Sequence, residues 1–295
     1  MEKMKTNGVV DSSKWKVIDT PQDSGFLPTV GVTLWLGWNG IILGLILYAI
    51  FLAGQWHRMF IIGLFTLSMI LPVNFPGALG YRLGDWMFVQ AEKYFGLKTV
   101  VEDEEGLIRH ANQNKAIIFA FNPHDMLPYS IFAFGPSLKR LPGKIGDDTR
   151  ALMSSAIFSV PFIRQVYTWV GGLPVDKRTF LARLNNGQSF AFSPGGVQEV
   201  LNLNPAKPNE LILYIKNRKG FIKLALTTGS PVVPVFSFNL DGSYGYWMPR
   251  GKLMEKVSRI LGFAPLLFWG RWLIPFGIPN PRKAHVVIGP GKTIC

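Results

Sequence analysis

The chain has 295 residues, enough for one large domain or for a domain with an appendage. Only 17% of them are charged, against about 25% in an average soluble domain, and the mean hydropathy is +0.22, so the composition favours a membrane-associated protein over a fully soluble one. The net charge of +13 comes from residues 106–295, which hold 23 Lys and Arg against 8 Asp and Glu, whereas residues 1–105 hold 8 against 10. A basic body favours anionic partners such as a membrane surface, nucleic acid or a phosphate-rich ligand.

Cysteine and histidine usage argues against disulfides and metals. Cys295 is the single cysteine, which excludes an internal disulfide and a four-cysteine zinc site. The histidines are widely spaced and form no HExxH or comparable arrangement: His57, His110, His124 and His285. We therefore expect no metal site and no bound cofactor. No known nucleic-acid reader motif is present, which argues against a nucleic-acid partner.

The first 76 residues predict a polar tail followed by a membrane anchor. Residues 1–28 are polar and lack the short apolar core of a cleaved signal peptide, so we expect a loosely ordered N-terminal tail. The apolar runs Val30–Ala53 and Met59–Leu71 follow, and neither contains a charged residue. Residues 29–76 therefore predict a transmembrane helical hairpin, with two core helices of a soluble protein as the alternative.

Residues 77–295 predict a globular α/β domain, which the positive-inside rule places on the cytosolic side. Predicted strands are Ala116–Phe121, Val166–Gly171, Ser189–Ser193, Leu211–Ile215, Val232–Phe238 and His285–Ile288. Predicted helices are Gly80–Leu97, Arg150–Phe158, Lys177–Asn185 and Gly220–Thr228. This alternation is typical of a mixed or mostly parallel sheet flanked by helices. The acidic cluster Val101–Glu105 predicts a solvated loop, and the apolar segment near residues 261–278 predicts an interfacial segment, with a soluble core helix as the alternative.

One stretch stands out by its position. The apolar run Ala116–Phe121 ends in Asn122 and Pro123, and His124 and Asp125 follow. Ligands of α/β sheets bind at the carboxyl ends of the strands, so a histidine at this point is a candidate site residue. Imidazole is suited to move a proton near neutral pH, which makes His124 a candidate general base. A histidine that only stabilises the turn is the alternative.

Two further stretches predict anion binding. In Ser193–Glu199, Gly195 and Gly196 form a tight turn whose N–H groups are unobstructed, although an ordinary strand-to-helix connection fits as well. In Arg218–Lys223, three cations surround the start of a predicted helix, where the helix dipole favours anions. A phosphate-bearing ligand at that helix would explain why cations stand at an end that favours anions, and a solvated basic face is the alternative.

Together these stretches resemble the type-2 diacylglycerol acyltransferase family, which includes monoacylglycerol and wax-ester acyltransferases. Asn122-Pro123-His124-Asp125 stands where the family has its His-Pro-His-Gly or Glu-Pro-His-Ser block. Three further family blocks match in order, at Ala156–Arg164, Pro194–Glu199 and Arg218–Phe236. The resemblance covers residues 30–290 of the sequence.

The resemblance implies a cytosol-facing acyltransferase domain that moves a fatty acyl group from acyl-CoA, a co-substrate, to the free hydroxyl of diacylglycerol. It implies His124 as the general base and Glu199 as the carboxylate that orients it, with Asp125 as a local alternative. The substrate-binding residues that it implies, including cations for the CoA phosphates, are Asn122, Pro123, Arg164, Gly195, Gly196, Arg218, Lys219, Gly220, Phe221 and Lys223. It also implies the endoplasmic reticulum membrane and lipid droplets as locations, and is compatible with a homo-oligomer.

Other functions stay open at this point. Monoacylglycerol or a long-chain alcohol is an alternative acceptor. A catalytically silent lipid-binding membrane protein is also an alternative, because Phe238-Asn239-Leu240 stands where the family usually has Phe-Gly-Glu. A phospholipid-pathway acyltransferase is disfavoured, because its His-x4-Asp pattern would require Asp at Tyr129.

Overall fold

A computed structural model gives the fold and describes residues 15–135, 140–204, 211–239, 242–249, 251–261, 264 and 266–293. The strands are β1 (Lys16–Asp19), β2 (Lys98–Val101), β3 (Ile118–Asn122), β4 (Arg150–Met153), β5 (Gly172–Pro174), β6 (Phe190–Phe192), β7 (Val232–Phe238), β8 (Gly245–Trp247), β9 (Leu267–Trp269) and β10 (His285–Ile288). The α-helices are α1 (Phe26–Leu36), α2 (Trp38–Phe51), α3 (Gln55–Ile70), α4 (Ala78–Phe95), α5 (Glu104–Asn112), α6 (Gly143–Asp148), α7 (Ile163–Trp169), α8 (Lys177–Asn185), α9 (Val197–Leu201), α10 (Gly220–Thr228) and α11 (Lys252–Leu261). Short 3₁₀ helices are η2 (Tyr129–Phe134), η4 (Ser155–Ser159) and η5 (Arg271–Leu273).

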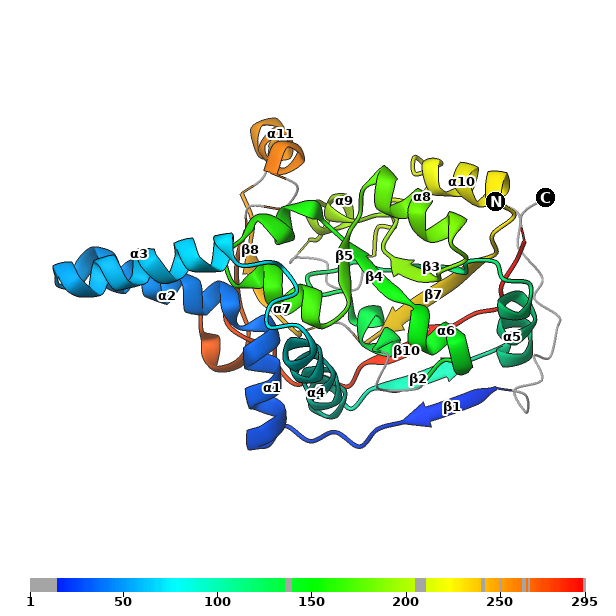
Figure 1. Cartoon of the computed structure of the whole chain (residues 1–295), viewed down its shortest axis with the longest axis horizontal. Helices are drawn as coiled ribbons and strands as arrows, with labels where there is room; N and C mark the ends of the chain where they lie inside the picture. Colours follow the sequence, from blue (N-terminus) through cyan, green and yellow to red (C-terminus); the bar gives the residue numbers. More distant parts are fainter. Residues whose placement is uncertain are drawn as a thin grey trace.

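Within these described ranges, eight strands form one mixed sheet in the order β1-β2-β10-β7-β3-β6-β4-β5 (Figure 1). The strands from β7 to β5 run parallel to their neighbours. β10 pairs antiparallel with β7, β2 runs parallel to β10, and β1 pairs antiparallel with β2 at the edge. Helices cover both faces of this sheet, so the predicted α/β class and the mixed sheet are confirmed.

The central strand β3 shows why both faces need a helical layer. Phe119 and Phe121 point into one apolar core, which includes Phe95 of α4. Ile118 and Ala120 alternate with them and point into a second core, formed with residues of α8 and α10. Successive side chains of a strand point to opposite faces, so an uninterrupted apolar run requires cover on both sides.

Several predicted elements are confirmed. The strands Val232–Phe238 and His285–Ile288 and the helices Lys177–Asn185 and Gly220–Thr228 have the predicted bounds. The strands predicted at Ala116–Phe121 and Ser189–Ser193 and the helix predicted at Gly80–Leu97 are present with shifted ends, as β3, β6 and α4.

Other predicted elements are wrong. Arg150–Phe158 is not a helix, because Arg150–Met153 pairs with β5 and β6 as strand β4. Val166–Gly171 falls largely in helix α7, which packs on α4. Leu211–Ile215 is irregular, with its first three side chains exposed. Short apolar runs do not distinguish strand from helix, and tertiary packing overrides their local propensity.

The N-terminal tail and the acidic cluster also differ from the predictions. Lys16–Asp19 lies within the predicted loose tail but forms strand β1, whereas residues 1–14 lie outside the described residues. In the acidic cluster, Asp103 caps helix α5, because its side chain accepts a hydrogen bond from the backbone N–H of Gly106 at 2.8 Å. Aspartate is a favoured N-cap residue, so the cluster starts a helix instead of forming a loop.

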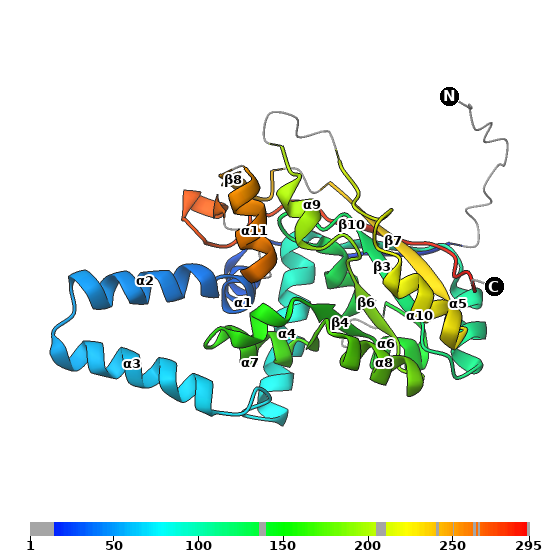
Figure 2. The ribbon, with the colours of Figure 1, turned by 90° about the horizontal axis from the view of Figure 1, so that it is seen from above.

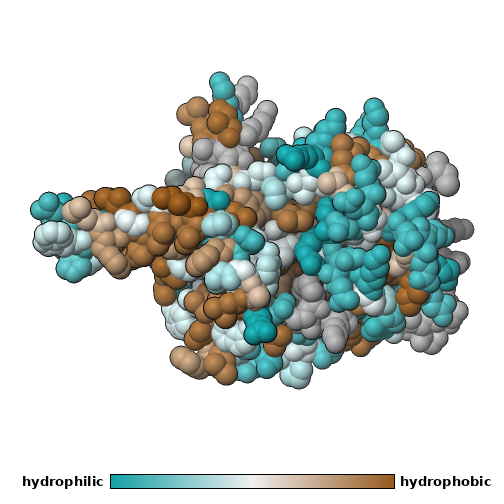
Figure 3. Space-filling model, viewed as in Figure 1, coloured by the Kyte–Doolittle hydropathy of each residue, from teal (hydrophilic) through white to brown (hydrophobic). Residues whose placement is uncertain are grey.

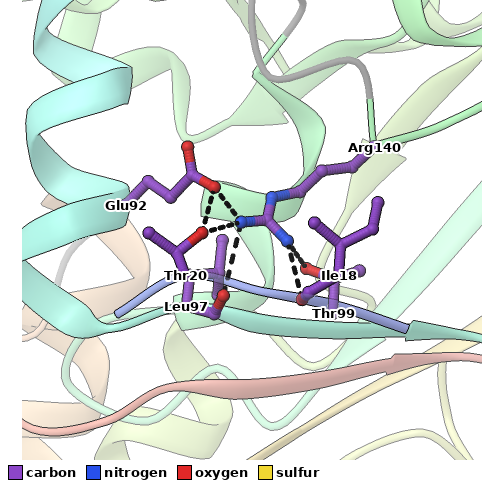
Figure 4. Close-up of polar contacts among 6 residues, drawn as sticks. All are labelled: Ile18, Thr20, Glu92, Leu97, Thr99 and Arg140. Carbon is purple, nitrogen blue, oxygen red and sulfur yellow. Dashed lines mark hydrogen bonds and ion pairs between the residues drawn. The ribbon is translucent and has the colours of Figure 1, made fainter. Parts of the chain in front are cut away.

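A buried arginine joins the N-terminal strand to the body (Figure 4). Arg140 is 1% exposed and donates to the hydroxyls of Thr99 at 2.9 Å and Thr20 at 2.8 Å, and also to Glu92. These partners belong to β2, to the segment after β1 and to α4. A buried guanidinium is tolerated only when it is paired and hydrogen-bonded, so this cluster ties the sheet edge to α4.

The predicted membrane hairpin has a different construction. The run Val30–Ala53 is not one helix, because α1 and α2 meet at Gly37 with a bend of 70°. α1 packs on α4 and buries Trp35 in the core, whereas α2 and α3 project from the body side by side (Figures 1 and 2). Hydrophobic side chains gather along this arm (Figure 3). Among the described residues, no single helix is long and apolar enough to cross a membrane, and α1 with α2 meets that test only as a bent pair.

Candidate active site

The loops that carry the predicted chemistry follow the carboxyl ends of two neighbouring strands. β3 ends at Asn122, just before His124, and β6 ends at Phe192, just before the glycine turn. The two strands are parallel neighbours. Their carboxyl ends therefore lie side by side, and the His124 loop meets the turn that holds Glu199.

Glu199 joins two loops through main-chain hydrogen bonds. It is 3% exposed, and its Oε2 accepts the backbone N–H of His124 at 2.8 Å. Its Oε1 accepts the backbone N–H of Tyr214 at 3.0 Å. Both carboxylate oxygens are thus engaged by main chain, and the expected bond from Glu199 to the imidazole ring is replaced by a bond to the backbone of the same residue.

The imidazole of His124 is oriented by a carbonyl. Its Nδ1 lies 2.9 Å from the main-chain oxygen of Asp125. A carbonyl oxygen only accepts, so Nδ1 carries the proton and Nε2 keeps a lone pair. Asp125 has a left-handed backbone with φ of 45°, which aspartate tolerates better than most residues. The ring is therefore held by the main chain of Asp125, instead of by the carboxylate considered from the sequence.

The environment of His124 favours its neutral form. Burial lowers the pKa of the imidazole below its ordinary value of 6.5. The carbonyl of Asp125 and the charge of Glu199 oppose this effect, because both stabilise the protonated ring. A neutral imidazole with a free Nε2 lone pair has the protonation state that a general base requires.

The two glycines of the turn make room for Glu199. A Cβ atom at Gly195 would lie 2.0 Å from Oε1 of Glu199, so only glycine fits there. Gly196 has φ of 51° and ψ of −143°, a backbone region that is almost restricted to glycine. Its N–H lies 3.4 Å from the hydroxyl of Ser193. The turn thus positions the buried carboxylate beneath it.

The predicted cations Arg218, Lys219 and Lys223 form a cation cluster next to the segment that Glu199 holds. Arg218 lies over the ring of Tyr214, with 5.4 Å from its guanidinium carbon to the ring centroid. Lys219 is the N-cap of α10, whose first turn contains no acidic residue, and Lys223 lies one turn further on. All three cations are exposed. They are connected to the His124 loop through Tyr214 and Glu199.

The other predicted contacts have different surroundings. Phe221 packs against Phe192 at 5.2 Å, in the core beneath α10. A Cβ at Gly220 would meet no described atom within 4 Å. Arg164 lies on α7 and donates to the carbonyl of Met69 at 2.9 Å, at the end of α3. The block that contains Arg164 therefore attaches the helical arm to the body.

Neighbouring residues strengthen that attachment. The Nε2 of Gln165 donates to the carbonyl of Ser68 at 2.6 Å, and the hydroxyl of Ser68 donates to Oε1 of Gln165 at 3.1 Å. The same hydroxyl accepts the backbone N–H of Phe162 at 2.6 Å. Both polar side chains are buried, so this junction holds the arm in a defined orientation.

Tyr214 was not predicted as a site residue, and Tyr129 stood out in the sequence only as the place where an aspartate is absent. Tyr214 acts through its backbone N–H, which leaves no signal in residue type. Tyr129 lies in a segment that forms η2, and its large aromatic side chain is typical of any core. Among the described residues, no group of three or more His, Cys, Asp or Glu side chains is arranged to hold a metal ion.

Comparison with known proteins identifies the family. The diacylglycerol acyltransferase family model matches residues 48–294, which include the His124 loop, the glycine turn and the cation cluster. The chain belongs to the diacylglycerol acyltransferase family. The suspected resemblance is thereby confirmed.

Individual relatives support this membership. Diacylglycerol O-acyltransferase 2 of Dictyostelium discoideum is 35% identical over 187 residues, covering 59% of this chain and 56% of that protein. The 2-acylglycerol O-acyltransferase 1 of Bos taurus is 30% identical, covering 58% and 54%. Diacylglycerol O-acyltransferase 2 of Xenopus tropicalis is 29% identical, covering 81% and 69%. The chain thus spans little more than half the length of the first two relatives.

One solved structure shows a distant likeness. The crystal structure of the 1-acyl-sn-glycerophosphate acyltransferase PlsC from Thermotoga maritima aligns over 90% of this chain and 85% of that chain. The sequence identity is 15% and the TM-score is 0.38.

Proposed function

We propose that this protein transfers a fatty acyl group from acyl-CoA to the free hydroxyl of diacylglycerol, forming triacylglycerol. One observation carries the proposal: the carboxylate of Glu199 holds the base-bearing loop and the segment before the cation cluster together. Family membership and the names of the related enzymes supply the reaction class.

The reaction follows from the state of His124. The acceptor hydroxyl donates to Nε2 of His124, which takes the proton as the oxygen attacks the thioester carbon. The carbonyl π electrons move to oxygen, and this oxyanion then collapses and expels the CoA thiolate. The imidazolium returns its proton to that thiolate. The carbonyl of Asp125 and the charge of Glu199 stabilise the imidazolium between these steps.

The cation cluster suits the phosphates of CoA. Arg218 and Lys219 precede α10, whose first N–H groups and dipole favour an anion, and Lys223 adds a third positive charge. An arginine fork matches phosphate oxygens, so Arg218 has the geometry for a bidentate contact. Acyl-CoA is the only co-substrate that this mechanism requires.

The arm formed by α2 and α3 suits a membrane anchor that leaves the acyltransferase domain on the cytosolic face of the endoplasmic reticulum or on lipid droplets. Its helices have 14 and 16 residues, about 21 and 24 Å, against a hydrocarbon core of about 30 Å. A hairpin of this length enters the bilayer from one side. Trp272 and Leu273, 62% and 74% exposed, lie in the segment whose main chain packs on Gly40 of α2, and would sit at the interface.

We expect the arm to retain the protein on membranes. Phe60 and Ile62 on α3 are 66% and 64% exposed, and replacing both by Asp puts two charges into the hydrocarbon layer. The double variant is expected to leave the membrane pellet after an alkaline carbonate wash. The matched control replaces Ile108 and Leu226, two exposed apolar residues of the body, by Asp. This control should stay in the pellet. A wild-type protein that washes off would contradict the anchor.

The function itself is tested with labelled acyl-CoA and a panel of acceptors. Membranes that contain the wild-type protein are expected to form labelled triacylglycerol from diacylglycerol, with lower rates for monoacylglycerol and long-chain alcohols. Replacing Arg218 and Lys219 by Ala should raise the KM for acyl-CoA about tenfold with little change in kcat, because two exposed phosphate contacts are lost.

The control for this variant has the same charge change elsewhere. Arg109 on α5 and Lys144 on α6 are exposed, and these helices precede β3 and β4. Both residues are thus on the side of the amino ends of these strands, whereas His124 follows a carboxyl end. Replacing them by Ala should leave the KM unchanged. Equal KM values in both double variants would assign Arg218 and Lys219 to a solvated face, and a wild type that transfers no acyl group to any acceptor would refute the function.

A further inference from the structure

Two buried polar atoms lack partners in the segment that carries His124. Oδ1 of Asn122 and the hydroxyl of Tyr129 are buried, and neither has a hydrogen-bond partner of normal geometry among the described residues. Folded proteins rarely leave such atoms unpaired, because an unmade buried hydrogen bond is destabilising. Two of them in one eight-residue stretch indicate a place where a ligand supplies the partner.

Both residues lie at the carboxyl end of the same strand pair. Asn122 is in register with Phe236 of β7. Ser130, which follows Tyr129, is hydrogen-bonded through its hydroxyl to Ser237, the next residue of β7. The His124 loop leaves β3 at this point. The unpaired groups therefore share the edge of the sheet that holds the base.

Tyr129 is held rigidly and has the character of a hydrogen-bond donor. Its side chain is 0% exposed, and its ring packs edge-to-face on Phe95, with 4.8 Å between centroids. Burial raises the pKa of its hydroxyl well above the ordinary value of 10, and the nearby charge of Asp125 raises it further, while a side-chain hydrogen bond with Ser243, outside normal geometry, opposes the shift. The hydroxyl stays protonated throughout the physiological range, so it is available to donate.

We propose that the Tyr129 hydroxyl donates a hydrogen bond to an acyl carbonyl oxygen in the active site. This inference rests on the proposed acyl transfer. As the acceptor oxygen adds to the thioester, the carbonyl π pair becomes a lone pair on that oxygen, and a rigid donor stabilises the new charge. The proton remains on Tyr129 throughout, and the carbonyl re-forms when the thiolate leaves. An ester carbonyl of diacylglycerol has the same chemistry and is the second source of such an oxygen.

The test replaces Tyr129 by Phe, which removes the hydroxyl and keeps the ring in its aromatic surroundings. If the thioester carbonyl is bound, kcat should fall about 10²- to 10³-fold with both diacylglycerol and hexadecanol, while the KM for acyl-CoA stays within about twofold. If the acceptor's ester carbonyl is bound, the loss should be confined to diacylglycerol, because hexadecanol has no ester. In either case the melting temperature should stay equal or rise, because an unpaired buried hydroxyl has been removed.

Tyr94 provides the matched control, since its buried hydroxyl donates to the carbonyl of Pro279 at 2.6 Å. Replacing Tyr94 by Phe should lower the melting temperature and leave kcat unchanged. The inference is overturned if Tyr129→Phe keeps wild-type kcat and KM with both acceptors. That result leaves the proposed function intact, whereas a wild type without acyl transfer refutes the function itself.

Discussion

Replacing His124 by Asn is expected to lower kcat for triacylglycerol formation about 10²- to 10⁴-fold, the usual contribution of a general base. The amide nitrogen of Asn can occupy the place of Nδ1 and donate to the carbonyl of Asp125, as the histidine does at 2.9 Å. The loop therefore keeps its shape, but no basic nitrogen replaces Nε2. The measurement is the initial rate with labelled acyl-CoA and diacylglycerol.

The KM values and a control residue make this test specific. Because the His124→Asn substitution removes no contact to acyl-CoA and only the Nε2 contact to the acceptor hydroxyl, the KM for acyl-CoA should change little. His57, exposed at the turn of the helical arm, is the matched control, and its replacement by Asn should leave kcat at the wild-type level. A His124→Asn variant with at least half of the wild-type kcat would remove this residue from the mechanism.

Replacing Glu199 by Gln should lower both stability and activity. The carboxylate accepts two backbone N–H groups, from His124 and from Tyr214. Glutamine has one oxygen to accept, and its NH₂ group would face the other N–H, so one buried donor is left unpaired. An unpaired buried donor costs about 1–3 kcal/mol, which corresponds to a loss of roughly 2–10 °C in melting temperature. We expect kcat to fall about 10- to 100-fold, because the loop that carries the base shifts.

The pH dependence separates this positional effect from a direct electrostatic one. The negative charge of Glu199 raises the pKa of His124 against the lowering caused by burial. Removing that charge therefore lowers this pKa further. The acid limb of kcat/KM, which lies below pH 6.5 in the wild type, should move to lower pH in Glu199→Gln.

Glu105 supplies the control for this substitution, since its side chain is 91% exposed. Glu105→Gln should match the wild type in melting temperature, kcat and pH profile. If Glu199→Gln also matches the wild type in all three, the carboxylate is dispensable, and the connection between the two loops must be maintained by other contacts.

The placement of His124 and Glu199 follows from the sequence, whereas their hydrogen-bond partners do not. His124 and Glu199 stand in sequence blocks that follow the parallel strands β3 and β6, so their meeting at one end of the sheet follows from parallel strand pairing. The orienting partner of His124 was not predicted correctly, because it is the main-chain oxygen of Asp125 and every residue has one. Tyr214 was not predicted for the same reason, since it contributes only a backbone N–H.

Some helices and strands also follow from the local sequence, whereas others depend on tertiary packing. Val232–Phe238 and His285–Ile288 were predicted with correct bounds, because both runs are rich in β-branched and aromatic residues and end at turn residues. Arg150–Met153 contains good helix formers, yet it lies between β5 and β6 and completes their hydrogen bonds as a strand. Gly37 looks like one more residue of an apolar run, but the packing of α1 on α4 turns the chain there by 70°.

The sequence by itself determined the family and the α/β class, and it placed His124 after a strand and basic residues around the start of α10, because residue type and spacing encode these directly. Only the tertiary structure decided what Glu199 holds, how the imidazole is oriented, and that Arg164 attaches the helical arm. Glu199 reaches a backbone group 75 residues away and another 15 residues away. Such bonds depend on which loops the sheet brings together, and the donors are main-chain atoms that have no residue-specific pattern in the sequence.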